Sequence, residues 1–391
     1  MAWKEQKKMD LRYALAKQFA TGEFSKVELA EIYNISRPTV DKWLKRYDLE
    51  GAGGLLDRSR RPHSSPIQTP HEVIDLILTM NKKKGWMAKK LMTHLKIKYP
   101  QFDTPARSTI HGILEKHNRV CKRPRRSHYK HPGKPFVNPT ASGEIWSMDF
   151  KGEFSLGNGS RCYPLTITDN YSRFLITVSG FHSPKYEPTR KAMERAFSEY
   201  GLPRAILTDN GAPFSSKAIG RLSRLSAWWI RLGVKPILTQ PSSPQQNGKH
   251  ERMHKELKRL TTRPPGYNMQ VQQRKFNEFI HDYNFELGHG GIEDRLPSSL
   301  FQHTNRPFLK EKKGFSYPEH FEKRLISANG GFRWGHERIP LTTTLEGEYV
   351  GLEEINDYLW KVFYRDFFLG VFDERLKKVE DAPDNFDRRC K

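Results

Sequence analysis

Three acidic residues stand in sequence contexts that suit metal chemistry: Asp149, Asp209 and Glu251. Asp149 lies in an alternating, strand-like segment. Asp209 directly follows the short apolar run Ala205–Thr208, and Glu251 lies about one turn into an expected helix, Gln246–Leu260. Carboxylates gathered at one point repel each other, and a divalent cation reverses that cost. If the three acids meet in the fold, they predict a metal site.

Magnesium is the cation that such a site favours, because Mg²⁺ prefers oxygen ligands and is bound by one or two carboxylates together with substrate phosphates. Two ions about 3.5–4 Å apart can activate the attacking oxygen and stabilise the leaving oxygen in a displacement at phosphorus. On the expected helix, Lys255 and Lys258 follow Glu251 at i+4 and i+7, on its face. His250, Arg252 and His254 are further candidates for DNA contacts.

The charge of the chain points to a polyanionic partner. The 391 residues carry a formal net charge of +23, and such a field attracts phosphate backbones or anionic membranes. No apolar run reaches the roughly 18–20 residues of a membrane span, and the N-terminus lacks the apolar stretch of a signal peptide. We therefore expect nucleic acid and no membrane. The cysteines (Cys121, Cys162 and Cys390) are too few and too scattered for a disulfide scaffold or a Cys-based zinc site.

The first segment, 1–56, predicts a helix-turn-helix domain. Ser25 and Glu28 form a capping-box pattern before the helix Lys26–Tyr33. Ser36 can cap the second helix, Arg37–Tyr47, after a short turn. This second helix offers side chains for the major groove and for phosphates: Arg37, Thr39, Lys42, Lys45 and Arg46.

Two basic linkers flank a second helical segment, 70–118, which we interpret as another helix-turn-helix or winged-helix domain. Its expected helices are Pro70–Lys82, Ala88–Lys98 and Ser108–His117. The linker 57–69 carries Arg58, Arg60 and Arg61, and the linker 119–142 begins with a run of cations without an acid. Such a run does not pack alone and can follow a DNA backbone. Its candidate DNA contacts are Lys122, Arg123, Arg125 and Arg126.

The remaining chain predicts an α/β core, 143–302, and a C-terminal β domain, 303–391. Three strand-like segments precede an order of helix, strand, helix, strand and helix, which is typical of a mixed, five-stranded α/β sheet. In the tail, Asn329-Gly330-Gly331 predicts a hairpin between Leu325–Ser327 and Phe332–Trp334, and further strands predict a small barrel.

Two conspicuous features of the expected core favour structural roles. Asp169 is a rival acid for the metal site, but its position in a hairpin turn favours a role in holding that turn. The pair Trp228-Trp229 is expected to pack in the core rather than to stack on bases.

Several motifs together resemble the catalytic core of insertion-sequence transposases in the integrase-core DDE group, relatives of retroviral integrases. The N-terminal helix-turn-helix and the tail segment Gly347–Leu352 are also similar to this group. The motifs that carry the resemblance are Trp146–Glu153, Tyr163–Asp169, Tyr171–Arg173, Thr208–Gly211, Trp228–Gly233 and Pro244–His254.

The resemblance implies an RNase H-like core in which Asp149, Asp209 and Glu251 form a DDE triad holding two Mg²⁺ ions, for which Mn²⁺ can substitute. It implies hydrolysis at transposon ends, followed by attack of the freed 3′-hydroxyl on target DNA. The expected partners are double-stranded terminal inverted repeats, target DNA and further copies of the chain, in a cytoplasm where the protein associates with the nucleoid. This chain departs from retroviral integrases in its helix-turn-helix units, which stand in place of a His/Cys zinc domain, and in a longer Asp209–Glu251 interval.

Two alternatives stay open at this point. A catalytically retired protein would act only as a helix-turn-helix regulator, although the presence of all three acids argues against it. An RNase H-like nuclease would cut DNA without joining it.

Overall fold

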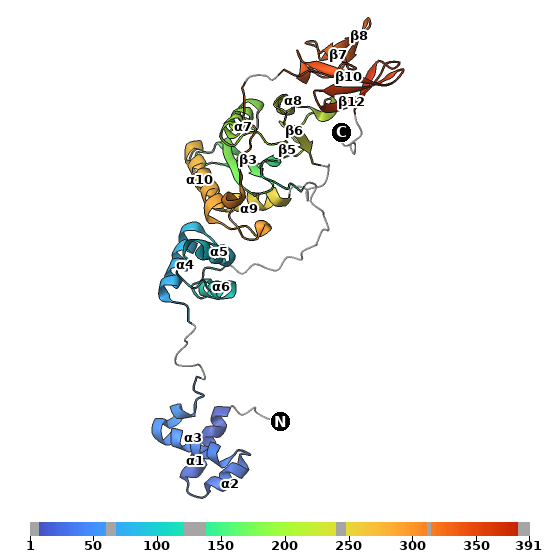
Figure 1. Cartoon of the computed structure of the whole chain (residues 1–391). Coiled ribbons are helices and arrows are strands. Elements are labelled where there is room, and N and C mark those ends of the chain that lie inside the picture. The colour runs from blue at the N-terminus through green and yellow to red at the C-terminus, as the bar shows by residue number, and fades with distance from the viewer. Residues whose placement is uncertain (1–7, 60–67, 121–137, 240–247, 311–313, 382–391) are drawn as a thin grey trace. The chain divides into compact units, whose positions relative to one another are not determined.

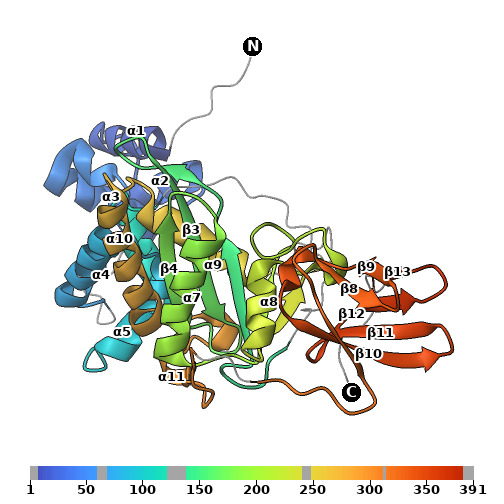
Figure 2. The ribbon, with the colours of Figure 1, turned by 90° about the horizontal axis from the view of Figure 1, so that it is seen from above.

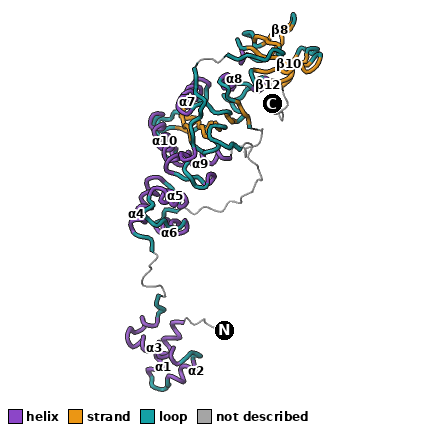
Figure 3. Tube along the Cα trace, in the orientation of Figure 1, coloured by secondary structure: helices purple, strands orange, loops and turns teal. Residues whose placement is uncertain are grey.

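The computed structural model describes residues 8–59, 68–120, 138–239, 248–310 and 314–381. The chain divides into two compact units, Met1–Thr69 and Pro70–Lys391. Within the described residues no helix is both long and apolar enough to cross a membrane. Figure 3 shows helices alone in the described parts before residue 138 and mainly strands after residue 320.

The first unit is a small three-helix bundle. The predicted capping box is confirmed: the Ser25 hydroxyl accepts from the Glu28 N–H, and the Glu28 carboxylate accepts from the Ser25 N–H. Ser36 does not cap the next helix through its side chain, because its hydroxyl pairs with that of Thr39. Leu15, Leu29, Val40 and Leu44 form the buried core. The elements are α1 (Lys8–Ala20), α2 (Lys26–Ile32), α3 (Arg37–Glu50) and the short η1 (Gly51–Leu55).

The second unit begins with three helices around Trp86, and no strand accompanies them within residues 68–120, so the described part has no wing. These helices are α4 (His71–Lys84), α5 (Ala88–Lys98) and α6 (Arg107–Lys116). Leu287, from the later part of the chain, is fully buried in the same cluster. The three helices therefore pack against the α/β core rather than standing apart from it.

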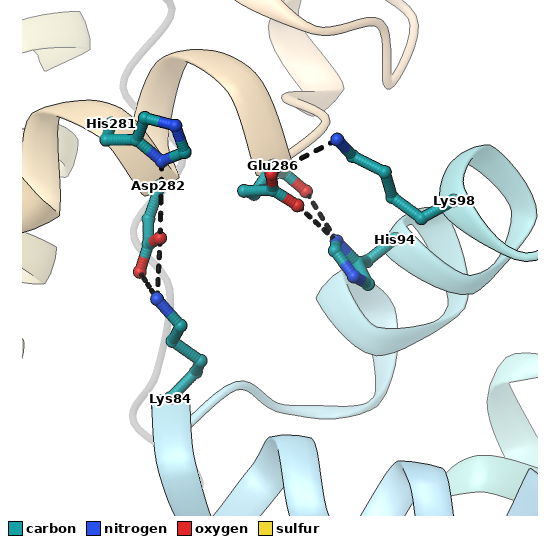
Figure 4. Close-up of polar contacts among 6 residues, drawn as sticks. All are labelled: Lys84, His94, Lys98, His281, Asp282 and Glu286. Carbon is teal, nitrogen blue, oxygen red and sulfur yellow. Dashed lines mark hydrogen bonds and ion pairs between the residues drawn. The ribbon is translucent and has the colours of Figure 1, made fainter.

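Ion pairs reinforce that contact (Figure 4). The Lys84 ammonium lies 2.6 Å from the carboxylate of Asp282, and Lys98 lies 3.1 Å from that of Glu286. His94 Nδ1 contacts the backbone carbonyl of Glu286 at 3.0 Å. On a neighbouring part of the contact, Lys90 pairs with Glu256, which lies on the helix that carries Glu251.

The centre of the second unit is a mixed sheet. Its main path runs β4-β3-β1-β5-β6, with β1 and β4 antiparallel to β3, and β1, β5 and β6 parallel. The order and directions are those of an RNase H-like sheet, as the resemblance implied. The sheet also contains a sixth strand of two residues, which was not predicted. Gly152, with φ of +78°, ends the first strand early, and the short strand follows as a separate element. The strands are β1 (Ile145–Phe150), β2 (Phe154–Ser155), β3 (Arg161–Asp169), β4 (Leu175–Phe181), β5 (Ala205–Thr208) and β6 (Lys235–Leu238).

Helices cover both faces of this sheet (Figures 1 and 2). On one face α7 and α8 enclose a core that includes Trp146, Phe197 and Trp229, which confirms the packing role predicted for Trp228 and Trp229. On the other face α9 and α10 bury Met253 and Phe276. The helical elements are α7 (Tyr186–Tyr200), η2 (Ile219–Arg221), α8 (Arg224–Arg231), α9 (Gly248–Thr261), α10 (Met269–His281), the π-helical η4 (Asp282–Glu286), η5 (Gly290–Ile292) and α11 (Pro297–Leu300).

Asp169 is a structural residue, as its turn position predicted. It is fully buried, its Oδ1 accepts from the Gly143 N–H, and its Oδ2 accepts from both the N–H and the hydroxyl of Ser172. One carboxylate thus ties the start of β1 to the turn between β3 and β4.

The C-terminal part is β-structured, but the predicted barrel is not confirmed. Five antiparallel strands form an open sheet in the order β13-β12-β11-β10-β7, and β8 and β9 form a separate hairpin. The predicted turn at Asn329-Gly330-Gly331 forms, because the Ser327 N–H donates to the Gly331 carbonyl at 2.9 Å. The predicted strand pairing across it is wrong: β8 pairs with β9, and Leu325 of β7 pairs with Tyr349 of β10. The elements are β7 (Glu322–Leu325), β8 (Gly331–Trp334), β9 (Glu337–Pro340), η6 (Thr343–Leu345), β10 (Tyr349–Asn356), β11 (Leu359–Tyr364), β12 (Phe367–Asp373) and β13 (Lys378–Asp381).

The ion pairs of Figure 4 give a first test. We expect the double variant Asp282→Asn/Glu286→Gln to raise amide hydrogen exchange at the end of α4 and in α5 roughly three- to tenfold, because partly exposed pairs contribute on the order of 1 kcal/mol. Glu278→Gln, an exposed acid on α10, is the matched control. Unchanged exchange in α5 of the double variant would show that the contact is held without these charges.

Candidate active site

Asp149 lies near the end of β1, on the sheet face that α9 covers. Its neighbour Met148 is buried in the cluster beneath α7 and α8, so the alternation of the strand directs Asp149 to the opposite face. The Asp149 side chain is 20% exposed. Burial, with the negative charges of Asp209 and, more weakly, Glu251, raises the pKa of Asp149 to about 7 against the opposing effect of Lys151.

Asp209 reaches the same place from the neighbouring strand. β1 and β5 are parallel, and Ser147 stands opposite Leu207. Asp149 and Asp209 each lie two residues further along their chains, so they come alongside one another. Asp209 Oδ1 accepts from the Gly211 N–H at 3.1 Å. A Cβ at Gly211 would lie 3.2 Å from the other carboxylate oxygen, so the glycine leaves that oxygen uncrowded.

Glu251 approaches from the helix above the sheet. It lies in the first turn of α9 and is exposed, as are Lys255 and Lys258 on the same helix face. The opposite face of α9 is buried against the sheet through Met253 and Leu257. The amphipathic pattern of the helix therefore fixes which side presents the acid.

The three carboxylates fit a hard divalent cation. All three side chains offer oxygens. Burial, and then the charges of Asp209 and Glu251, make ionisation of Asp149 unfavourable, and a bound cation would offset that cost. Carboxylate oxygens are the kind of ligand that hard divalent cations prefer.

His250 and His254 are the second feature of the site. They are 2% and 3% exposed and contact hydroxyls of β3. Both nitrogens of His250 are engaged, Nε2 with Thr166 at 2.6 Å and Nδ1 with Thr168 at 3.0 Å. His254 Nε2 contacts Thr166 at 2.7 Å, and its Nδ1 lies 3.7 Å from Asp149 Oδ2.

These histidines correct one sequence expectation. His250 and His254 were expected to contact DNA, but they face the sheet and are buried, so they are not available at the surface. Asp149, His250 and His254 also bring one potential ligand atom each within 4.8 Å of one another. Both nitrogens of His250 are already in contact with threonine hydroxyls. Burial lowers the pKa of His250 to about 3 and that of His254 to about 2.

The other expected DNA contacts lie on several elements. Arg37, Lys42 and Lys45 are exposed on α3, whereas Arg46 is half-buried and lies over the Trp43 ring. Thr39 is half-buried and Arg58 pairs with Glu50. Arg252, Lys255 and Lys258 are exposed on α9. Six residues lie outside the described part of the chain: Arg60, Arg61, Lys122, Arg123, Arg125 and Arg126.

Thr166 and Thr168 were not predicted as parts of the site. The signal was present, because both are polar residues at alternate positions of an otherwise apolar strand. Thr166 stands directly opposite Asp149 in the β1–β3 register.

Family models define the class of the domains. Two models described as integrase core domain match residues 139–244 and 232–297. A helix-turn-helix domain model matches residues 11–63, and a homeodomain-like domain model matches residues 39–114. The chain therefore contains an integrase core domain together with helix-turn-helix domains.

Particular relatives are mobile-element proteins. The chain is 27% identical over 163 residues to an uncharacterized 31.7 kDa protein of insertion element IS407 from Burkholderia multivorans, covering 41% of this chain and 56% of that protein. It is 29% identical over 154 residues to an IS476 protein from Xanthomonas euvesicatoria, covering 38% and 41%. The chain thus spans about half the length of these two relatives. With the transposase of transposon Tn552 from Staphylococcus aureus it shares 23% identity over 418 residues, covering 93% and 83%.

Among solved structures, the HTLV-2 integrase catalytic core in complex with magnesium matches 43% of this chain and 100% of that chain, at 17% identity and a TM-score of 0.33. A simian T-cell lymphotropic virus intasome matches 73% and 91%, at 13% identity and a TM-score of 0.39.

The raised pKa of Asp149 predicts a stability effect that depends on metal. Between the ordinary carboxyl pKa and about 7 the folded state binds more protons at this residue than the unfolded state, so its contribution to stability falls as pH rises through that window. At pH 8 without metal, the free energy of unfolding of Asp149→Asn should therefore be roughly 1–3 kcal/mol higher than that of the parent, so the variant is the more stable protein. Mg²⁺ should then stabilise the parent more than the variant. Denaturant unfolding at pH 8, with chelator or Mg²⁺, checks this, and a less stable variant in chelator would contradict it.

Proposed function

We propose that this protein is a DDE-type transposase that binds the terminal inverted repeats of an insertion sequence and catalyses Mg²⁺-dependent strand cleavage and 3′-hydroxyl strand transfer. The observation that carries the proposal is geometric: the parallel strands β1 and β5 and the helix α9, whose apolar face packs on the sheet, bring Asp149, Asp209 and Glu251 toward one another. Burial, with the charges of Asp209 and Glu251, raises the pKa of Asp149 accordingly. A cluster of mutually repelling acids in a chain of net charge +23 fits a site in which cations bridge protein and phosphate. The mobile-element relatives support the same class of activity.

The chain's own residues supply position and charge. Asp149 and Asp209 are held on adjacent strands, and Glu251 is fixed by a helix whose other face is buried. Two bound Mg²⁺ ions would supply Lewis-acid stabilisation of the attacking and leaving oxygens. Lys255 and Lys258, exposed beside Glu251, are placed to neutralise phosphates of the strand next to the site.

DNA recognition is assigned to the parts before the core. We propose helix-turn-helix domains at 1–56 and 70–118, basic linkers at 57–69 and 119–142, the catalytic core at 143–302, and a DNA-contacting β domain at 303–391. The exposed cations of α3 support groove binding by the first domain. Pairing two transposon ends requires at least two copies of the chain, so the proposal includes a homo-oligomer on DNA, in the cytoplasm and at the nucleoid.

The catalytic assignment predicts a separation of binding from chemistry. Asp149→Asn should bind end DNA as the parent does and lose cleavage and strand transfer by at least roughly 100-fold, because a neutral amide binds Mg²⁺ much more weakly than a carboxylate does. Glu187→Gln, an exposed acid on α7, should keep activity. A Mg²⁺ assay on labelled end DNA with a target plasmid measures both steps.

Cutting and joining by the Asn variant would overturn the assignment. If the parent protein cut DNA without joining it, the result would indicate a nuclease. If the parent bound end DNA tightly but neither cut nor joined it, the result would indicate a regulator.

The lysines of α9 predict a salt-dependent effect. Lys255→Ala and Lys258→Ala should each weaken end binding and reduce the slope of log affinity against log salt by roughly one, because each phosphate contact releases a counterion. Lys191→Ala, an exposed lysine on α7, is the control. Slopes that stay the same in the α9 variants would remove these lysines from the DNA interface.

A further inference from the structure

The helix α9 presents three different sides to its surroundings. At about 100° per residue, its buried residues gather on one side, which packs against the sheet. Glu251, Lys255 and Lys258 share a second side, which is exposed. Glu256 and Arg259 fall on a third side, about 80–140° around the helix axis from Glu251. The residues of the buried side are His250, Met253, His254 and Leu257.

The third side of α9 contacts the helices that precede the core. Glu256 pairs with Lys90 of α5. The Arg259 guanidinium donates to the backbone carbonyl of Gly85, just after α4, at 2.8 Å. A Cβ at Gly85 would lie 3.6 Å from the side chain of Leu260, also on α9, so the chain between α4 and α5 lies directly against this helix. Contacts therefore hold α9 on two sides, and Glu251 lies on the side that stays exposed.

The pair between Lys90 and Glu256 differs from the other ion pairs of this contact. Among the lysines that pair across it in the described residues, Lys90 has the least exposed side chain, at 19%, against 33% for Lys84, 43% for Lys98 and 49% for Lys89. The acids that pair with these other lysines lie beyond α10. Loss of one partner of a buried pair leaves an uncompensated charge, which costs far more than loss of an exposed pair.

We propose that Lys90 is a positioning residue for Glu251 and acts through its ion pair with Glu256. Contacts on one side alone leave a helix free to roll about its axis, whereas contacts on two sides fix its rotation. A metal-binding geometry must be held within roughly 0.5 Å and 10–20°, so a small roll of α9 is enough to displace the Glu251 carboxylate. The inference rests on the proposed function only in naming Glu251 as a ligand of the cation.

Reversal of the two charges separates this ion pair from the rest of the contact. Lys90→Glu and Glu256→Lys each place two like charges together, whereas the double variant Lys90→Glu/Glu256→Lys restores an opposite pair. Circular dichroism and thermal unfolding show whether each variant is folded. If Lys90→Glu does not fold, Lys90→Gln gives the same comparison with a smaller change. The matched control is Asp282→Asn/Glu286→Gln, which removes acids of the same contact that lie outside α9.

Two measurements on the full chain test the proposal without using catalysis. Amide hydrogen exchange in the first turns of α9 should rise in each single variant, return toward the parent rate in the charge-reversed double variant, and stay at the parent rate in the control. Titration with Mn²⁺, followed through the paramagnetic resonance signal of the free ion, should show roughly three- to tenfold weaker binding in the single variants. The affinity should recover in the charge-reversed double variant.

Three results would overturn the proposal: unchanged exchange in α9 of Lys90→Glu, no recovery in the charge-reversed double variant, or an equal loss of Mn²⁺ affinity in the control. Failure of the transposase assignment would show differently, because the parent would neither cleave nor join end DNA while both measurements still gave the expected order. A cation bound elsewhere would be unaffected by Asp149→Asn, and the exchange rates in α9 would then decide the proposal alone.

Discussion

The repulsion among three carboxylates is the constraint on which the site depends. Asp149 is held mostly out of water and within the field of Asp209 and Glu251, so its anion is unfavourable in the protein alone. The surrounding structure keeps these charges from moving apart. Asp149 and Asp209 are carried by neighbouring parallel strands, and Glu251 is carried by a helix with an apolar face buried against the same sheet.

Distant segments of the chain hold α9 in place. His250 and His254 attach the first turns of this helix to β3 through contacts with the Thr166 hydroxyl. Further along the same helix, Glu256 pairs with Lys90 of α5. The position of Glu251 therefore depends on contacts that α9 makes with both the sheet and the helices that precede the core.

Much of this arrangement could be predicted from the sequence, because local patterns determine it. The strand alternation around Asp149, the turn after Asp209 and the amphipathic pattern around Glu251 each indicate an element and a face. What could not be predicted depends on pairing between distant segments. The sequence around His254 predicts an exposed cation, and only the contact with β3 shows that the side chain is buried. Leu325 pairs with the distant Tyr349 and not with the strand after the nearest glycine turn.

The most direct test of the central claim is a crystal structure of the protein soaked in Mn²⁺, with the ion located by its anomalous scattering. We expect manganese bound by oxygens of Asp149, Asp209 and Glu251 at about 2.0–2.3 Å, with His250 and His254 still bonded to the hydroxyls of β3. Manganese bound instead by the two imidazoles, or carboxylates of the three acids that share no ion, would contradict the account.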